Sequence, residues 1–142
     1  MVIYKVYGPP VPWAAPQRCK DSFYNPKHKE KLQVIWQLKS QVNHPPFFGP
    51  VRLDVNFYMP IPKSTSGIKR RQMLSGMIHH IGKPDRSNLL KFIEDCLQAA
   101  EAISNDSIIV AGETQKIYGE EPQTIIRLTE ISLINQGVKD AS

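Results

Sequence analysis

The fold of this chain is decided by the stretch Lys83-Pro84-Asp85-Arg86-Ser87-Asn88-Leu89-Leu90-Lys91-Phe92-Ile93-Glu94-Asp95. Apolar side chains recur there and just beyond it at the spacing of one helical face: Leu89, Phe92, Ile93, Cys96, Leu97 and Ala100. Such a stripe, entered through a proline and an aspartate, is typical of an amphipathic helix packed on a core. The sequence therefore predicts a helix over about residues 86–103, with residues 87, 91 and 95 on a different side from the core.

Alternating and β-branched segments predict a sheet around this helix. Residues 2–7 and 51–59 alternate between apolar and polar side chains, and shorter β-branched strands are predicted at 107–111 and 124–131. A second helix is predicted from Asn25-Pro26 to about Val42, with loops at 13–25 and 60–68 and one helical turn at 69–75. The chain thus reads as a single α+β domain over residues 1–135, a mixed sheet packed by two main helices, with a frayed tail at 136–142.

The formal net charge of +5 is divided unevenly along the chain. Residues 1–92 hold 15 Lys or Arg against 4 Asp or Glu, whereas residues 93–142 hold 3 against 9, and residues 60–83 contain no acid at all. Because a basic surface attracts polyanions by releasing their counterions, we expect this segment to bind DNA phosphates. The alternative is a solvated loop. The candidate DNA-binding residues are Lys63, Lys69, Arg70, Arg71 and Lys83.

Composition argues against several other classes. No apolar run approaches the roughly 20 residues that span a bilayer, and the N-terminus lacks the pattern of a signal peptide. Cys19 and Cys96 do not have the spacing of zinc ligands, so we expect no zinc site and a protein that works in the reducing cytoplasm. We also expect neither a membrane nor a small-molecule cofactor as a partner. His79 and His80 have no further His or Cys nearby and are expected in a strand, one side chain inward and one outward.

Carboxylates stand near both ends of the predicted helix, with Asp85 before it, Asp95 within it and Asp106 after it. Mg²⁺ prefers oxygen ligands, usually a few carboxylates with water and substrate phosphate, and can activate a water molecule. Lys91 lies one turn after Ser87, where an ammonium could pair with a scissile phosphate. The alternative is structural: Asp85 or Ser87 caps the helix, Asp95 lies on the surface and Asp106 belongs to a turn.

Taken together, these residues resemble the RusA family of Holliday-junction resolvases. The family signature is similar to Lys-Pro-Asp-x-Asp-Asn-Leu-x-Lys, followed by a helix and then by a paired Asp-Asp before a strand. The residues that match it here are Lys83, Pro84, Asp85, Asn88, Leu89 and Lys91. The spacing Tyr4-x-Val6-x-Gly8-x-Pro10-x-Pro12 and Tyr24 also fit the family's N-terminal half, so the resemblance covers about residues 2–132.

The resemblance implies a small homodimer that binds four-way DNA junctions and nicks them symmetrically with Mg²⁺, or Mn²⁺, in DNA recombination and repair. It implies that Asp85 and Asp106 are catalytic aspartates at the metal and that Lys91 is the catalytic lysine. Ser87 and Asn105, the remaining candidate metal ligands, each replace an aspartate of the family pattern. Both are weaker ligands, so the second hypothesis is a branched-DNA-binding protein that cuts slowly or not at all.

Some residues keep two interpretations. Asp95 and Glu113 are acids that could compensate for the missing charge if they reach the metal. Aromatic residues are found more often in cores or dimer interfaces, and this is the first interpretation of Trp13, Phe23 and Tyr24. The alternative is that these side chains act as a wedge at the centre of the DNA junction. A third hypothesis, a basic domain acting on RNA, requires the motif match to be coincidence.

Overall fold

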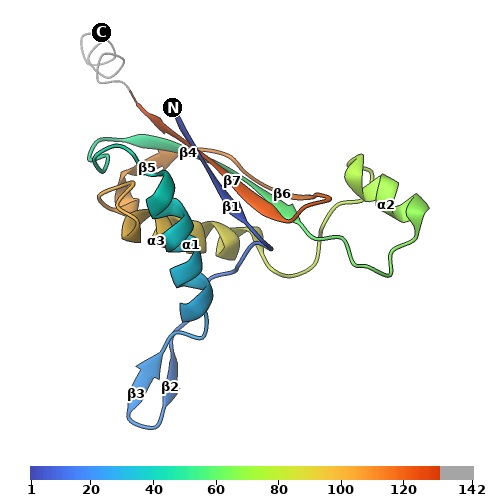
Figure 1. The fold of residues 1–142 in the computed structure, drawn as a ribbon, viewed down its shortest axis with the longest axis horizontal. Coiled ribbons are helices and arrows are strands. Elements are labelled where there is room, and N and C mark those ends of the chain that lie inside the picture. The colour runs from blue at the N-terminus through green and yellow to red at the C-terminus, as the bar shows by residue number, and fades with distance from the viewer. Residues whose placement is uncertain (132–142) are drawn as a thin grey trace.

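A five-stranded mixed sheet organises residues 1–131, which are the residues that the computed structural model describes (Figure 1). Strand β1 (Val2–Tyr7) pairs antiparallel with β7 (Gln123–Glu130), which pairs antiparallel with β4 (Val51–Met59). On its other side β4 pairs parallel with two short strands in succession, β5 (Ile109–Ala111) and β6 (Thr114–Tyr118). The sheet therefore combines antiparallel and parallel pairs, as the α+β prediction requires.

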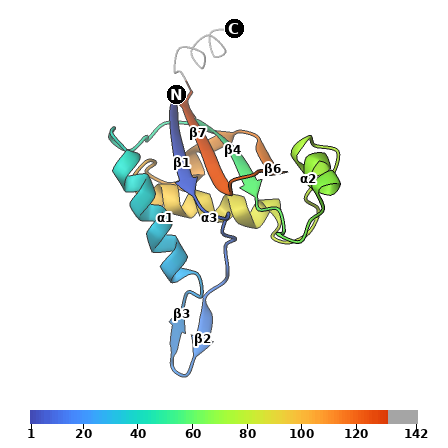
Figure 2. The same ribbon diagram turned by 45° about the vertical axis from the view of Figure 1, so that its right-hand side comes forward.

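Two helices, α1 (His28–Gln41) and α3 (Arg86–Ala99), cover one face of this sheet (Figure 2). In β4, the odd-numbered residues from Val51 to Met59 are buried, whereas the even-numbered ones reach the opposite, more exposed face. This alternation is the expected one for a sheet with one packed face. The core consists of these strand residues, the apolar stripe of α3, and Val34 and Leu38 of α1.

The main elements confirm the predictions from periodicity, but α3 is shorter than predicted. It ends at Ala99, with Ala100 as its C-cap, and not near residue 103. Ala102 and Ile103 are nevertheless buried, because the chain turns back there and Ile103 forms a bridge with Phe47. The apolar pattern predicted burial correctly, while the helix itself stops at the turn.

Several predictions were wrong. Residues 13–25, predicted as a loop, contain the antiparallel hairpin β2 (Gln17–Cys19) and β3 (Ser22–Tyr24). The helical turn predicted at 69–75 is present but longer, as α2 (Gly67–Leu74), a helix of eight residues. The strand expected at 107–111 begins with the 3₁₀ helix η1 (Asp106–Ile108), and β6 was not predicted. His79 and His80 lie outside any strand, although one is exposed and the other half-buried as expected.

Two segments project away from the sheet and its helices. The β2–β3 hairpin extends beyond one end of α1, and residues 60–83, here called the α2 arm, leave the end of β4 and return before α3 (Figures 1 and 2). No residue of α2 is buried. Both projections therefore have most of their surface free for contact with another molecule.

The remaining sequence predictions concern extent and setting. The predicted domain boundary at 135 and the tail at 136–142 lie outside the described residues. Within residues 1–131, no helix has the length and apolar character needed to cross a bilayer.

Candidate functional site

The beginning of α3 is fixed to the sheet by two cationic side chains. Lys116 of β6 donates from Nζ to the carbonyl oxygens of Gly82 and Pro84, at 2.8 and 3.0 Å. Arg86, the first residue of α3, donates from a guanidinium N–H to the Thr114 carbonyl at 3.3 Å. These contacts join the end of the α2 arm, the start of α3 and the parallel strand β6 into one unit.

Asp85 is the N-cap residue of α3, but its side chain makes no capping hydrogen bond. Its two carboxylate oxygens instead accept from Lys83 Nζ, at 2.8 and 3.0 Å. The lysine side chain is 85% exposed and the aspartate side chain 46% exposed. An ion pair this exposed contributes little stability, so either partner can be exchanged for a phosphate or a cation.

Ser87, the second residue of α3, opens onto a cavity of about 530 Å³. The cavity is also lined by the turn at Gly112 and Glu113 and by the first two residues of β6. The backbone N–H of Glu113 donates to Asp54 Oδ1 at 2.9 Å, which ties this turn to β4. A hydrogen bond from Arg52 holds the pKa of Asp54 below its usual value, so Asp54 stays ionised as the anchor of the turn.

Lys91 lies one turn beyond Ser87 on the outer side of α3, as predicted. Its Nζ lies 3.5 Å from the ring centroid of Trp13, which is a cation–π contact. The backbone N–H of Trp13 donates to the carbonyl of Asn88 at 3.0 Å. The N-terminal segment therefore contacts α3 beside the predicted catalytic lysine, a contact that sequence reasoning did not predict.

Asp106 and Asn105 lie at the other end of α3, which is about 20 Å long. The backbone N–H of Asp106 donates to Gln98 Oε1 at 3.0 Å. The side-chain oxygen of Asn105 accepts from the Ser107 N–H at 2.9 Å and caps η1. Asp106 is the first residue of this short 3₁₀ turn, which agrees with the structural alternative for that residue. Asp85 and Asp106 are thus not brought together in this conformation.

Glu94 is an acid near Asp106 that sequence reasoning did not single out. Partial burial raises the pKa of Glu94, and the carboxylates of Asp106 and Asp95 raise it further. Glu94 follows Ser87 by seven residues, and a spacing of two helical turns could have indicated that both share one side of α3. Like charges held close together weaken the fold at neutral pH and attract cations.

The four candidate metal ligands do not fit a single ion as they are arranged. Asp85 pairs with Lys83, Ser87 faces the cavity, and Asn105 and Asp106 lie at the far end of α3. Among residues 1–131, no group of three or more His, Cys, Asp or Glu side chains converges. Glu113 lines the same cavity as Ser87, but neither it nor Asp95 belongs to such a group.

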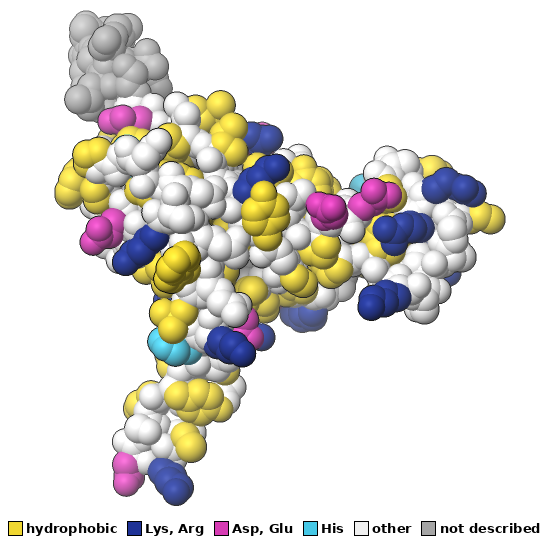
Figure 3. Space-filling view, in the orientation of Figure 1, with side chains coloured by type: hydrophobic (Ala, Val, Ile, Leu, Met, Phe, Trp, Pro, Cys, Tyr) yellow, Lys and Arg dark blue, Asp and Glu magenta, His cyan; other side chains and the backbone are white. Residues whose placement is uncertain are grey.

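The basic side chains of the α2 arm form a separate surface (Figure 3). Lys63 and Lys69 are exposed, and Arg70 and Arg71 follow on α2. The arm returns to the body where the His80 ring packs against Tyr118 of β6, with 5.2 Å between ring centroids. Burial lowers the pKa of His80, as does the nearby Lys116, so this ring is neutral where it packs. Four of the five candidate DNA-binding residues therefore lie along the arm, and the fifth, Lys83, lies at its base.

The aromatic side chains of the N-terminal half have different surroundings. Trp13 is half-buried and packs against the core, as expected. Phe23 and Tyr24 are 72% and 48% exposed on the β2–β3 hairpin, so they are not core residues.

The chain is similar to known proteins over most of its length. The family model for endodeoxyribonuclease RusA matches residues 8–129, from the end of β1 to the last strand. The chain belongs to the RusA endodeoxyribonuclease family. The chain is also 32% identical over 139 residues to the uncharacterized protein YqaN of Bacillus subtilis (strain 168), covering 91% of this chain and 96% of that protein. The RusA family implies Holliday-junction endonuclease activity, binding of branched DNA and a general dependence on metal.

Proposed function

We propose that this RusA-family protein is a structure-selective endodeoxyribonuclease that nicks four-way DNA junctions as a homodimer, in DNA recombination and repair in the cytoplasm. The observation that supports this most is the family match, which includes the motif Lys83-Pro84-Asp85 with Asn88 and Lys91. The motif lies at the exposed start of α3, at the base of the basic α2 arm. A homodimer suits the substrate, because a two-fold protein can present two equivalent sites to two equivalent strands.

The proposed DNA contacts are electrostatic. Lys63, Lys69, Arg70 and Arg71 on the arm neutralise phosphates of one duplex, which leads the backbone toward α3. Lys83 exchanges Asp85 for a phosphate, and this exchange releases the Asp85 carboxylate next to the bound strand. Lys91 stabilises the charge that develops on the phosphate during cleavage.

In this proposal Mg²⁺ or Mn²⁺ supplies the Lewis-acid chemistry, as is general for the family. Asp85 and Asp106 are the proposed catalytic carboxylates, with Ser87 and Asn105 as weaker oxygen donors. These four side chains do not converge on a single ion in the described conformation.

The second candidate function is a branched-DNA-binding protein with little or no cleavage. Two observations favour it: Ser87 supplies a neutral hydroxyl where the family pattern has an aspartate, and the Asn105 side chain already caps η1. In this case the arm and the dimer bind the junction while the carboxylate site stays incomplete.

A cleavage assay separates the two functions. A labelled four-way junction is incubated with protein and Mg²⁺ or Mn²⁺, then resolved on a denaturing gel. We expect nicks with wild type and at least a tenfold loss in Asp85→Asn, while the matched control Asp21→Asn, on the exposed hairpin, cuts like wild type. Junction binding without nicks under either metal would establish the second function.

Restoring the missing charge gives a stricter test of residue 87. Ser87→Asp adds a carboxylate at the wall of the cavity, so we expect tighter Mn²⁺ binding and faster nicking. If Ser87→Asp changes neither quantity, residue 87 does not act at the metal.

A further inference from the structure

The contact between Trp13 and Lys91 carries an inference that goes beyond the family motif. Lys91 Nζ lies 3.5 Å from the Trp13 ring centroid, well inside the roughly 6 Å range of a cation–π contact, and tryptophan is the aromatic residue that attracts cations most strongly. Asp95 follows Lys91 by four residues, the spacing of a helical ion pair, yet the two form no ion pair. The ammonium therefore lies on the ring and not on the nearby carboxylate.

This choice of partner matters for a lysine that must meet a phosphate. A carboxylate would neutralise the ammonium and occupy its N–H donors. An aromatic face holds the charge by its quadrupole and leaves the N–H groups on the far side free to donate. Lysine also has a long, flexible stem with much rotamer freedom, which the ring restricts.

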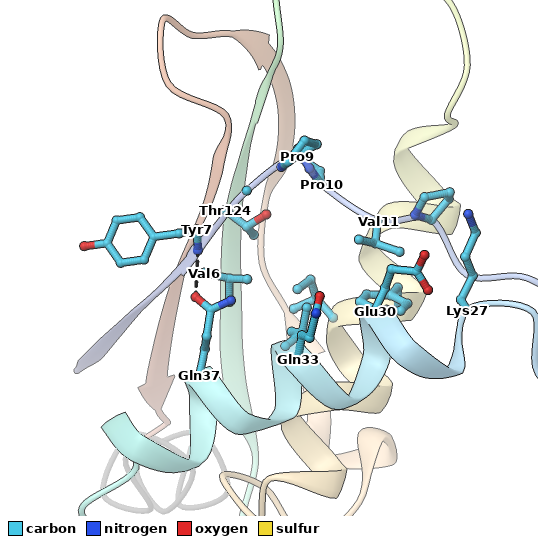
Figure 4. Close-up of a pocket in the computed structure, with 15 residues that line it drawn as sticks. Val6, Tyr7, Pro9, Pro10, Val11, Lys27, Glu30, Gln33, Gln37 and Thr124 are labelled. Carbon is cyan, nitrogen blue, oxygen red and sulfur yellow. Dashed lines mark hydrogen bonds between the residues drawn. The ribbon is translucent and has the colours of Figure 1, made fainter.

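Trp13 is itself held in place through both its backbone and its side chain. Its backbone N–H donates to the Asn88 carbonyl at 3.0 Å, and its side chain packs against the core. The preceding segment contains Pro9, Pro10 and Pro12, and it is attached at Gly8, whose N–H donates to the Pro122 carbonyl at 3.1 Å. Figure 4 shows this segment crossing above α1, where it forms one wall of a cavity of about 310 Å³. Proline fixes the backbone, so the ring is a rigid support for a flexible lysine.

We propose that Trp13 is a positioning residue for Lys91: its ring holds the ammonium, charged and with free donors, where it meets a phosphate of the bound junction. This proposal rests on the proposed function for the identity of the ligand. It extends the site to the N-terminal segment, and it assigns the Trp13 ring to a lysine and not to a DNA base.

The contact itself is tested first by fluorescence without DNA. Trp36, the second tryptophan, is 77% exposed on α1, so Trp36→Phe leaves Trp13 as the single tryptophan in a folded protein. Because an ammonium on the ring quenches indole, Lys91→Met in this background is expected to raise the emission of Trp13. The matched control Lys39→Met, an exposed lysine on α1, leaves it unchanged. Unchanged emission in Lys91→Met overturns the proposal.

The role is tested by a double-mutant cycle on junction cleavage. Trp13→Leu is expected to reduce the single-turnover rate at saturating junction about tenfold in the wild-type background, and to have no further effect in Lys91→Met. Trp13→Phe keeps an aromatic ring that attracts cations less strongly, so its single-turnover rate is expected to lie between those of wild type and Trp13→Leu. Equal losses in both backgrounds mean that Trp13 acts through the fold alone, and this result overturns the inference.

Failure of the nuclease proposal has a different signature. If wild type binds junctions without cutting them, the same cycle is measured on the dissociation constant, where coupling between Trp13 and Lys91 supports the positioning role and additivity overturns it. Thermal unfolding of Trp13→Phe and Trp13→Leu confirms that the compared proteins are folded.

Discussion

Glu94 lies at the point where the negative charges of α3 and η1 meet. Its pKa is raised by burial and by Asp106 and Asp95, so the unfolded chain ionises at this residue before the folded protein does. The stability associated with Glu94 is therefore complete below its ordinary pKa of 4.5 and is lost as the pH rises through the higher folded value. At neutral pH this charge opposes folding.

Glu94→Gln removes that opposition. We expect a higher melting temperature than wild type at pH 7 and no difference below the ordinary glutamate pKa, measured by thermal unfolding across pH. Glu101→Gln, at an exposed position after the helix, serves as the control with little effect. Equal stability of Glu94→Gln and wild type at pH 7 would contradict the charge conflict.

Gly112 is the residue at which the backbone allows least change. Its φ is +143°, and a Cβ there would lie 1.7 Å from the carbonyl oxygen of Leu53. Gly112→Ala is expected to lower stability by at least about 2 kcal/mol and to distort the cavity wall that carries Glu113. Urea unfolding measures this loss.

The control is Gly67→Ala, which has open space around its Cβ and should change stability by less than about 1 kcal/mol. Similar losses in Gly112→Ala and Gly67→Ala would contradict the close approach of Gly112 to Leu53.

At the scale of elements, α1 protects the free edge of the sheet. Strand β1 has a partner on one side, and on the other side its Lys5 and Tyr7 N–H groups donate to the side chains of Gln41 and Gln37, each at 2.9 Å. The Gln41 amide also donates to the Lys5 carbonyl at 2.7 Å. The unpaired backbone N–H and C=O groups of an exposed edge strand can pair with a strand of another chain. Here the two glutamines occupy three of these groups, the N–H groups of Lys5 and Tyr7 and the carbonyl of Lys5.

Gln41→Ala is expected to lower stability by about 1 to 2 kcal/mol and to increase self-association, because two edge hydrogen bonds are lost. Urea unfolding and light scattering measure the two effects. The control is Gln33→Ala, an exposed glutamine of the same helix without a hydrogen bond among the described residues. No difference between the two variants would show that Gln41 does not protect the edge.

The elements that the sequence predicted correctly are those that bury one face against the core. β1, α1, β4, α3 and β7 each bury one face, so their apolar residues recur at a readable period. The β2–β3 hairpin and α2 contain no buried residue, so no period marks them, and β6 depends on parallel pairing with a strand more than fifty residues earlier. Elements without a buried stripe cannot be read from a pattern of hydrophobicity.

For the candidate site, the sequence correctly predicted Asp85 at the entry to α3 and Ser87 and Lys91 on its first two turns. The position of Asp106 could not be predicted, because it depends on how the chain turns after Ala99 and on the hydrogen bond with Gln98. The contact of Lys91 with Trp13 could not be predicted either, since the two residues are 78 positions apart in sequence and no periodicity relates them.

At the scale of the whole molecule, the α2 arm supplies charge at a distance from the sheet. If Lys69 and Arg71 each neutralise one phosphate, Lys69→Gln/Arg71→Gln should reduce the slope of log K against log salt for junction binding by about 2. The control Lys29→Gln/Lys39→Gln makes the same change in net charge on the exposed side of α1 and should leave the slope nearly unchanged. Equal reductions would mean that net charge, and not the arm, determines binding.

The most direct test of the proposed function is the strand-by-strand mapping of cuts in a four-way junction. Each of the four strands is labelled in turn, and the products with Mg²⁺ or Mn²⁺ are compared with those from a linear duplex of the same sequence. We expect paired nicks at equivalent positions in two opposite strands of the junction and none in the duplex. Cuts in a single strand, or equal cutting of junction and duplex, would contradict the proposed function.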